Sequence, residues 1–399
     1  MKILILSTWF PYPPIQGSKI RAYNMIRSLS QEHEVAVISF KDMDVKDEWI
    51  EHLHQYCKEV IIVDQNPFHY SKFKTWLGFF STRPSAVVAG YSAKMAGAVQ
   101  EFARKWKPDL LFALTFVTAP YALQITKTLR VVDMDNLLAL MLRDLYINAQ
   151  GFFQKQRRYL AYRKFKNYEN HLYQKFDLAL VCSDLDKSRA VEYIDLSKEK
   201  IVPIPNGIEI KLSPPRTIHK FNHKLIFNGS LSYWPNFDAM DYFLSDIFPL
   251  ILKSIPDCEI LITGKNDAVD THKLPDYQGK VIFTGFVEDI HALVSSCAAC
   301  VVPLRHGAGT RLKVLEAMAV GTPVVTTPKG AEGLEVNHGQ HLLLANTPED
   351  FANKTVQILQ DQNFREKIVQ EGRMLVEKVY DWRVIGQKLN QTINSLTNS

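Results

Sequence analysis

Cysteine is scarce in this chain, and the few that occur are scattered. The 399 residues include five cysteines, at positions 57, 182, 258, 297 and 300. An odd, scattered set is unlike the disulfide framework of a small secreted domain. Cys297 and Cys300 make one CxxC pair, but a zinc site needs a second pair of ligands at suitable spacing. We therefore expect the thiols to pack as small buried hydrophobic groups, in a reducing cytoplasmic compartment.

Long apolar runs are also missing. The N-terminal sequence MKILILSTWF holds only a short run, from Ile3 to Leu6. A secretory signal peptide needs a longer apolar core and a cleavage site of small residues. No stretch reaches the roughly 18 apolar residues of a membrane span. We expect a soluble protein, or one that is at most peripheral at the inner face of the plasma membrane.

A strong excess of charge of one sign is the third missing feature. The net charge is +5, and charged residues make up 22% of the chain. Domains that bind nucleic acid usually concentrate basic residues on one face, so nucleic acid is not an expected partner. The weak positive balance is compatible with anionic small molecules or with an anionic membrane surface.

The pattern that is present is an alternation of short apolar strands and amphipathic helices. In the first half we predict strands at 2–7, 34–39, 109–113, 129–133 and 177–182, and helices at 18–29 and 93–106. After a stretch rich in proline and glycine, at 203–215, we predict strands at 224–228, 259–263, 281–284, 299–303, 323–326 and 341–344. Apolar strands separated by helices are typical of parallel sheets covered on both faces. The predicted fold class is α/β.

The length of the chain and the linker predict two Rossmann-like, doubly wound domains. We place the first at 1–208 and the second at 209–379. A last helical pattern, from about 382 to 396, ends the chain. We expect the terminal segment, about 380–399, to pack back on the first domain.

The most informative stretch is RHGAGTRLKVLEAMAVGTPVV at 305–325. Gly307 and Gly309 precede a helical pattern, and a helix N-terminus carries unpaired N–H groups and the positive end of the dipole. Phosphates bind at such positions, and glycine lets the backbone approach them closely. Thr310 can cap the helix or donate its hydroxyl. The loop is neither a Walker GxxxxGK[ST] loop nor a GxGxxG loop.

Charged side chains surround this helix start. Arg305, Arg311 and Lys313 can neutralise a phosphate, and arginine can hold two of its oxygens at once. On a helical wheel, Lys313 and Glu316 fall on the shoulder opposite the apolar face. Glu316 lies about 6 Å along the helix axis from Leu312. This is roughly the distance from a phosphate to a ribose in a bound nucleotide, and a carboxylate can accept hydrogen bonds from the ribose hydroxyls. An alternative stays open, in which Glu316 only pairs with Lys313 or complements the helix dipole, and the glycines only form a tight turn.

These residues resemble the nucleotide-sugar glycosyltransferases of the group 1 type, family GT4, which have the GT-B architecture of two Rossmann-like domains facing a central cleft. The string GTRLKVLEAMAVGTPVVTT is similar to the most specific segment of that family. Further pieces occur in the family's order: FPYPPIQGSKIRAYN at 10–24, PNGIE at 205–209, FNGSLSYWPNFDAM at 227–240, TGFVEDI at 284–290 and AEGLEV at 331–336. The resemblance covers nearly the whole chain.

The resemblance implies that a nucleoside-diphosphate sugar binds mainly to the second domain and the acceptor mainly to the first. Glu316 matches the second glutamate of the family's E-x7-E motif, which holds the ribose. The first glutamate would stand at position 308, where this sequence has Ala308 within a GAGT loop. We therefore expect the backbone amides of Ala308–Thr310 to take part near the donor sugar.

The resemblance extends the set of expected donor-binding residues beyond the loop. The full set is Gly17, Ser18, Gly229, Ser230, Lys265, Phe286, Val287, His306, Gly307, Ala308, Gly309, Thr310 and Glu316. Gly17 would let the first loop approach the donor phosphates, and Phe286 with Val287 would lie beside the nucleobase. The alternatives are a simple turn at Gly17, core packing of the Phe286–Val287 pair, and a solvated Lys265.

The sequence DMDN at 133–136 closes a strand of the first domain. Asp133 and Asp135 point to the same side if the backbone is extended, and the family often has an acidic pair near the acceptor. One of them could orient or activate the acceptor hydroxyl, and helix capping is the alternative. Together with Arg305, Arg311 and Lys313, these two aspartates are our catalytic candidates.

The segment FFQKQRRYLAYRKFKNYENHLYQKF at 152–176 is both basic and aromatic. A basic amphipathic helix can lie on an anionic membrane, which suits the lipid-linked acceptors of many relatives. The alternative is a solvated helix whose aromatic side chains pack inward.

The predicted function is that of a retaining hexosyltransferase that needs neither a metal nor another cofactor. It would move a hexose-type sugar from a UDP- or GDP-linked donor to a hydroxyl of a glycan or lipid-linked acceptor, in cell-surface polysaccharide or glycolipid synthesis. Cations at the leaving phosphate would stabilise the transition state more than the ground state. Two alternatives remain: a sugar-nucleotide epimerase of the same fold, and a non-catalytic membrane-surface scaffold. The missing acidic residue at Ala308 gives the scaffold some weight, and the intact nucleotide-binding positions argue against it.

Overall fold

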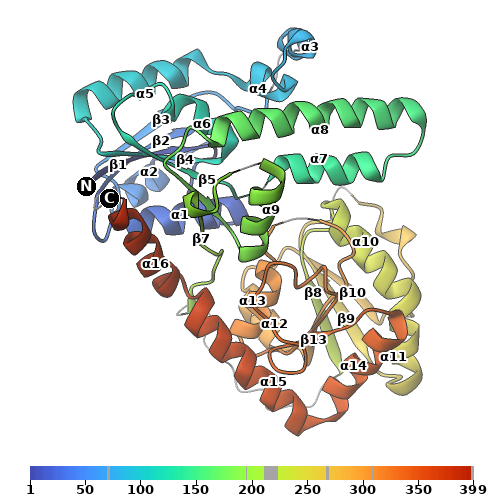
Figure 1. The fold of residues 1–399 in the computed structure, drawn as a ribbon. Helices are drawn as coiled ribbons and strands as arrows, with labels where there is room; N and C mark the ends of the chain where they lie inside the picture. Colours follow the sequence, from blue (N-terminus) through green and yellow to red (C-terminus); the bar gives the residue numbers. More distant parts are fainter. Residues whose placement is uncertain are drawn as a thin grey trace. The chain divides into compact units, whose positions relative to one another are not determined.

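The computed structural model describes residues 1–69, 72–135, 137–194, 196–210, 223–266, 269–307 and 309–396. The chain forms two compact units, shown in Figure 1. Unit 1 comprises Met1–Pro205 and Ile385–Ser399, and unit 2 comprises Asn206–Val384. Much of the predicted linker, including Ser213–Pro215, lies outside the described residues.

Unit 1 is built on a parallel sheet with the strand order β3-β2-β1-β4-β5-β6-β7. Its strands are β1 (Lys2–Ser7), β2 (Glu34–Phe40), β3 (Glu59–Val63), β4 (Leu110–Leu114), β5 (Leu129–Asp133), β6 (Leu178–Val181) and β7 (Ile201–Pro203). Its helices are α1 (Gly17–Leu29), α2 (Asp47–His54), α3 (Lys72–Phe80), α4 (Ser85–Gly90), α5 (Ala93–Trp106), α6 (Thr115–Ala122), α7 (Leu138–Ile147), α8 (Phe152–Tyr173), α9 (Asp184–Ile194) and the short η1 (Lys198–Lys200). The strand order reverses between β1 and β4, which makes this a doubly wound Rossmann-like sheet.

Unit 2 repeats the plan with the order β10-β9-β8-β11-β12-β13, again all parallel. Its strands are β8 (Lys224–Asn228), β9 (Glu259–Thr263), β10 (Val281–Gly285), β11 (Ala299–Val302), β12 (Val324–Thr326) and β13 (Leu343–Leu344). Its helices are α10 (Trp234–Tyr242), η3 (Phe243–Ile247), α11 (Phe248–Ser254), η4 (Thr271–Lys273), α12 (Ile290–Ser295), α13 (Leu312–Ala319), α14 (Pro348–Gln360), α15 (Gln362–Leu375) and η5 (Val376–Tyr380).

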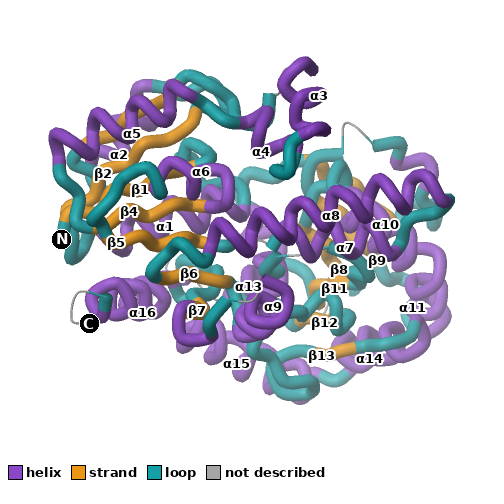
Figure 2. The backbone as a smooth tube through the Cα atoms, turned by 45° about the horizontal axis from the view of Figure 1, so that its top comes forward, coloured by secondary structure: helices purple, strands orange, loops and turns teal. Residues whose placement is uncertain are grey.

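Each sheet has its own hydrophobic core, because apolar strands such as KILILS in β1 are covered on both faces. Figure 1 shows α5 on one face of the unit 1 sheet and α1 on the other, and Figure 2 shows the strands between the helices. All five cysteines are buried and free, as expected. Within the described ranges, every helix is too short or too polar to cross a bilayer.

The last helix, α16 (Trp382–Ser395), begins in unit 2 and ends in unit 1. Within unit 1 the Asn390 side-chain amide donates to the backbone oxygen of Ser28, at the end of α1, at 2.9 Å. Gly386 lets the two helices approach, since a Cβ there would lie 2.5 Å from the Ser28 Oγ. A small residue is therefore required where α16 crosses α1.

The strand pattern expected from the sequence is confirmed in both units. Four strands have the predicted bounds, β1, β5, β8 and β9, and the other predicted strands differ only at their ends. Two strands, β3 and β7, were not predicted. The sequence EVIIV of β3 is partly exposed, and β7 has three residues, so neither gives a clear buried run.

Candidate functional site

The predicted donor-binding residues of unit 2 gather where its strands end. Gly229 and Ser230 follow β8, Lys265 follows β9, and Phe286 follows β10. The glycine loop, residues 305–310, connects β11 to α13. Because the carboxyl ends of parallel strands meet at one edge of a sheet, these positions share the edge at which α/β folds bind ligands.

Glu316 is held by an asparagine at this edge. The side-chain amide of Asn228, the last residue of β8, donates to Glu316 Oε2 at 2.9 Å. The amide oxygen of Asn228 accepts from the buried thiol of Cys300 on β11, at 3.7 Å. Burial raises the pKa of Glu316, against the opposing effects of His291, Lys313 and the Asn228 hydrogen bond. The carboxylate is thus hydrogen-bonded to a neutral amide, while the charges of His291 and Lys313 act on it without a direct ion pair.

Lys313 is held in the same way, one turn earlier on α13. Its Nζ donates to the Asn236 side-chain oxygen at 3.0 Å and lies 4.0 Å from the centre of the Phe227 ring. Burial lowers the pKa of Lys313 to about 7. A Cβ at position 229 would lie 2.5 Å from this Nζ, so Gly229 provides the space that the ammonium occupies. No ion pair joins Lys313 to Glu316, which are both described, and the simple pairing of the two is therefore wrong.

The glycines of the loop adopt backbone conformations that other residues rarely reach. Gly307 has φ +104° and Gly309 has φ +85°. A Cβ on Gly307 would lie 3.2 Å from a terminal nitrogen of Arg311, so the loop folds tightly over that buried guanidinium. The predicted contribution of Ala308 lies outside the described residues.

Thr310 does not cap α13, contrary to one of our expectations. The N-cap residue is Arg311, and it makes no side-chain capping bond. The Thr310 hydroxyl instead accepts from the Asn206 side-chain amide, at 3.1 Å. Because this bond ties the glycine loop to the first residue of unit 2, it restricts where the loop can move.

Arg305 and His306 lie against α10. The Arg305 guanidinium makes two hydrogen bonds to the Asp238 carboxylate, at 2.7 and 3.2 Å, and lies over the Tyr242 ring. His306 packs against Trp234, with ring centroids 4.9 Å apart. Arg305 must therefore share its charge with Asp238 before it can serve a phosphate.

The turns after β8 and β9 are interlocked. Ser230 Oγ donates to the backbone oxygen of Lys265 at 3.0 Å, while the Lys265 side chain is exposed. Gly264 lies so close that a Cβ there would be 2.7 Å from the Gly229 carbonyl carbon. These contacts fix the Gly229–Ser230 backbone beside the Lys313 ammonium.

The aromatic position after β10 is open to solvent. The Phe286 side chain is 77% exposed, and Val287 is half-buried. Core packing of Phe286 is therefore wrong. An exposed aromatic ring at the ligand-binding edge of a sheet is a surface on which a flat group can stack.

In unit 1, Asp133 forms a buried ion pair. Arg21 on α1 donates from Nε and Nη2 to the two oxygens of Asp133, at 2.8 and 2.6 Å, and from Nη1 to the backbone oxygen of Ile204. Arg21 and Asp133 are 1% and 2% exposed. Burial alone would lower the pKa of Arg21, but the adjacent Asp133 carboxylate raises it above its usual range. Both carboxylate oxygens of Asp133 are occupied inside the protein.

Asp135 has a different environment at the end of the same strand. Its Oδ2 accepts from the Ser18 hydroxyl, at 2.8 Å, in the first turn of α1. The Cys182 thiol lies 3.6 Å from Oδ1. Gly17 is exposed as the first residue of α1. Because Asp135 is only half-buried, it is the member of the acidic pair that a ligand could reach.

Neither aspartate caps the following helix, so the capping alternative is wrong. The N-terminus of α7 is held by Glu169 on α8, whose carboxylate accepts from the backbone N–H groups of Leu138 and Ala139 at 3.2 and 3.0 Å. Burial raises the pKa of Glu169 to about 7.

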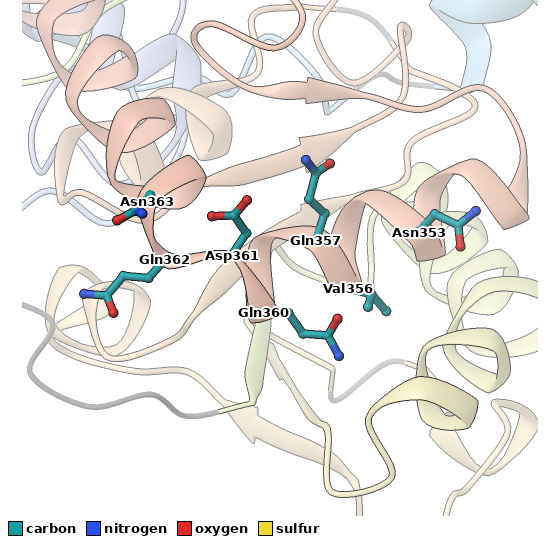
Figure 3. Close-up of a pocket in the computed structure, with 7 residues that line it drawn as sticks. All are labelled: Asn353, Val356, Gln357, Gln360, Asp361, Gln362 and Asn363. Atoms are coloured by element: carbon teal, nitrogen blue, oxygen red, sulfur yellow. The ribbon is translucent and has the colours of Figure 1, made fainter.

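Two pockets lie apart from these residues. A shallow one of about 710 Å³ is lined by the carboxamide side chains of Asn353, Gln357, Gln360, Gln362 and Asn363, with Val356 and Asp361 (Figure 3). Asp361 accepts from the Phe364 N–H as the cap of α15. A pocket of about 910 Å³ in unit 1 lies between α4, α6 and α8. Neither shares a residue with the Lys313–Glu316 cluster.

Comparison with known proteins identifies the class that this fold and site define. A model described as glycosyl transferases group 1 matches residues 222–361, and a model described as glycosyltransferase family 4 matches residues 15–212. The chain belongs to the group 1, family 4 glycosyltransferases. Its two Rossmann-like units are those of the GT-B fold.

The similar proteins cover the chain to different extents. An uncharacterized 44.6 kDa protein in the cps region of Klebsiella pneumoniae is 24% identical over 392 residues, which is 95% of this chain and 96% of that protein. The phosphatidyl-myo-inositol mannosyltransferase of Mycobacterium leprae is 27% identical over 164 residues, 39% of this chain and 43% of that protein. The crystal structure of Anabaena HepE in complex with UDP and glucose shares the fold, with a TM-score of 0.68 and 18% identity, over 99% of this chain and 100% of that one.

Sequence reasoning missed the residues that hold the site together. Asn228 and Asn236 orient Glu316 and Lys313, and Arg21 occupies Asp133. Each partner is far away in sequence, 88 residues in the case of Asn228 and Glu316. Their positions in the sequence could have indicated a role in the site, because Asn228 ends a buried strand and Asn236 lies in the first turn of the next helix.

Proposed function

We propose that unit 2 binds the nucleoside-diphosphate part of a sugar donor through α13 and the loops around it. The observation that carries the proposal is the pair Lys313 and Glu316, each oriented by an asparagine amide beside a loop of positive-φ glycines. The ammonium is at hand for a diphosphate and the carboxylate for ribose hydroxyls. Phe286 supplies a stacking surface for the base. The UDP and glucose bound to HepE support a UDP-linked hexose as donor, with GDP as the second base to test.

The proposed reaction transfers a hexose with retention of the anomeric configuration. The bond between the anomeric carbon and the diphosphate oxygen breaks, and its electron pair stays on the diphosphate. The acceptor hydroxyl oxygen forms the new bond to that carbon and gives up its proton to a carboxylate, for which Asp135 is the candidate. Lys313 and Arg311 would stabilise the negative charge on the leaving diphosphate without a metal. Arg305 would contribute if it binds the diphosphate while it also binds Asp238. Removing one donor of this kind typically lowers the rate about 10²–10³-fold.

We propose that unit 1 binds the acceptor, with Asp135 orienting its hydroxyl. The contacts that support this choice are the occupied oxygens of Asp133 and the half-buried position of Asp135 beside Ser18. A carboxylate within hydrogen-bond reach of a hydroxyl can hold it or take its proton. A lipid-linked or glycan acceptor in cell-surface polysaccharide or glycolipid synthesis is proposed, at the cytoplasmic face of the membrane. The name of the mycobacterial mannosyltransferase supports a lipid acceptor.

The test is donor consumption by the purified chain. UDP- and GDP-linked hexoses are incubated with the protein, and the released nucleoside diphosphate is measured with and without lipid-linked and glycan acceptors. We expect release with one nucleotide, faster when the acceptor is present, and a product whose anomeric configuration by NMR equals that of the donor. Absence of release from every donor would contradict the proposed transfer, and an inverted product would contradict the retaining mechanism.

A further inference from the structure

The two-helix hairpin formed by α7 and α8 carries an exposed apolar surface that none of the described elements of unit 1 covers. Met141, Leu145, Ile147, Phe152, Phe153 and Leu160 are all exposed, Phe152 by 71% and Phe153 by 87%. We call these six residues the hairpin-tip surface. In Figures 1 and 2 the helices run side by side, and the turn between them lies beyond the unit 1 strands.

The exposed apolar side chains are not needed to pair the two helices. The seam between α7 and α8 is filled by tyrosines, with Tyr146 packed against Tyr159 and Tyr162 at centroid distances of 5.2 and 6.4 Å. Arg158 donates to the backbone oxygen of Leu145 at 2.8 Å and ties the end of α7 to α8. The hairpin is therefore held from inside, and its outer residues are available for a partner.

The charge of the same region is positive. The sequence of α8 holds six lysines and arginines and a single carboxylate. That carboxylate, Glu169, is buried and caps α7. Phe153, Arg157 and Leu160 recur at helical spacing and are all exposed, so apolar and cationic groups share one face. The lysines and arginines of α8 therefore have no accessible carboxylate beside them on the same helix.

We infer that the hairpin-tip surface docks on an anionic lipid bilayer. Aromatic and aliphatic side chains enter the boundary between headgroups and acyl chains, and flanking lysines and arginines attract anionic lipids. Four of the six residues of the surface, all except Phe152 and Phe153, offer no ring on which a nucleic acid base could stack, so a bilayer fits the surface better than RNA does. Docking of this surface rests on the location at the membrane proposed above, but it does not depend on which donor the protein uses.

Vesicle sedimentation without nucleotide tests the inference. The full chain is mixed with vesicles of phosphatidylcholine, or of an equal mixture of phosphatidylcholine and phosphatidylglycerol. We expect binding to the anionic vesicles that weakens as salt is raised. The double variant Phe152→Ser/Phe153→Ser should bind at least about a hundred-fold more weakly, since each buried phenylalanine contributes roughly ten-fold or more. Lys155→Gln and Arg157→Gln should each weaken binding about five-fold.

Matched controls carry the same changes elsewhere in unit 1. Phe80→Ser removes an exposed phenylalanine from α3, and Arg104→Gln removes an exposed cation from α5. Both should sediment like the wild type, and all variants should keep the circular dichroism and nucleotide-induced thermal shift of the wild type. Wild-type binding by the Phe152→Ser/Phe153→Ser variant, or loss of binding in Phe80→Ser alone, would overturn the inference. So would a wild-type dimer that this double variant converts to a monomer while neither form binds vesicles.

Discussion

In unit 1 the buried carboxylate of Asp133 faces the guanidinium of Arg21 through two hydrogen bonds, whereas in unit 2 Glu316 and Lys313 each face an asparagine amide. Both arrangements give a buried charged group the hydrogen bonds that it loses when it leaves water. Only the first pairs the charge directly with an opposite one. An ion pair is complete without a ligand, while a charge oriented by a neutral amide keeps most of its electrostatic potential for a ligand.

The Arg21–Asp133 pair thus differs from the proposed binding pair, Lys313 and Glu316, although the residues are of the same chemical types. Asp133 was predicted as a catalytic candidate because it belongs to an acidic pair that the family often has near the acceptor. Glu316 was predicted as a ribose ligand because of its place on the helix shoulder and its match to the second glutamate of the E-x7-E motif. Their partners distinguish them. Removing one member of a buried ion pair strongly destabilises the folded protein. Residues kept for function, in contrast, often lower the stability of the folded protein.

The largest effect is expected when the pair in unit 1 is broken. Asp133→Asn leaves the Arg21 guanidinium buried without a counter-charge and should lower the free energy of unfolding of unit 1 by about 3–5 kcal/mol. Urea unfolding, followed by probes in each unit, measures the loss. Asp135→Asn at the half-buried neighbour is the control and should change the stability much less. Equal losses in the two variants would show that the Arg21–Asp133 pair has no special structural role.

The next effect should be on rate and not on stability. Lys313→Met keeps a flexible side chain beside Phe227 but removes the ammonium, so turnover should fall about 10²–10³-fold. Because burial disfavours the charged form of Lys313, the variant should be as stable as the wild type or more so. Steady-state kinetics and thermal unfolding on the same preparation check both halves. A variant that keeps its turnover would remove Lys313 from the site.

Glu316→Ala should lower turnover at least ten-fold and leave the protein folded. The reason is loss of the ribose contact, with Asn228 keeping its hydrogen bond to the Cys300 thiol. Donor titrations compare this variant with Glu316→Gln, whose side chain can still accept one hydrogen bond. The turnover of Glu316→Gln should lie between that of the wild type and that of Glu316→Ala. Unchanged turnover in Glu316→Ala would contradict the assignment of the carboxylate to the donor.

Gly229→Ala tests whether the space beside Lys313 matters. The added Cβ would lie 2.5 Å from Lys313 Nζ, so the ammonium must move. We expect nucleotide affinity to fall about ten-fold, with a change in unfolding free energy within about 1 kcal/mol. Calorimetric titration measures the affinity. In the Lys313→Met background the same substitution should have little further effect, and a full additive loss there would contradict the explanation.

The remaining effect is the pH dependence of donor binding. The pKa of Lys313 is lowered to about 7 in the free protein, and a bound diphosphate would raise it. Below pH 7 the ammonium is already present, and above pH 7 binding must take up a proton. The dissociation constant of a nucleotide sugar should therefore rise by up to about ten-fold per pH unit above 7, and this slope should vanish in Lys313→Met. A wild-type dissociation constant that is independent of pH between 7 and 9 would contradict the role of this lysine.

Much of the fold and part of the site could be predicted from the sequence. Apolar strands such as KILILS and the amphipathic pattern of α13 are local signals, and they placed Lys313 and Glu316 on one shoulder of a helix. Local periodicity does not report which distant side chain meets a charge. The partners of Glu316 and Asp133 lie 88 and 112 residues away, so only the folded sheet reveals that one is an amide and the other a guanidinium.

A thermal-shift screen of the wild type and the Lys313→Met/Glu316→Ala double variant against UDP, GDP and ADP shows whether α13 binds a nucleotide. A ligand at about 100 times its dissociation constant adds about 2.7 kcal/mol of stability to the protein that binds it. We predict that one nucleotide stabilises the wild type clearly and the double variant little. No shift in the wild type, or equal shifts in both proteins, would contradict a nucleotide site on α13.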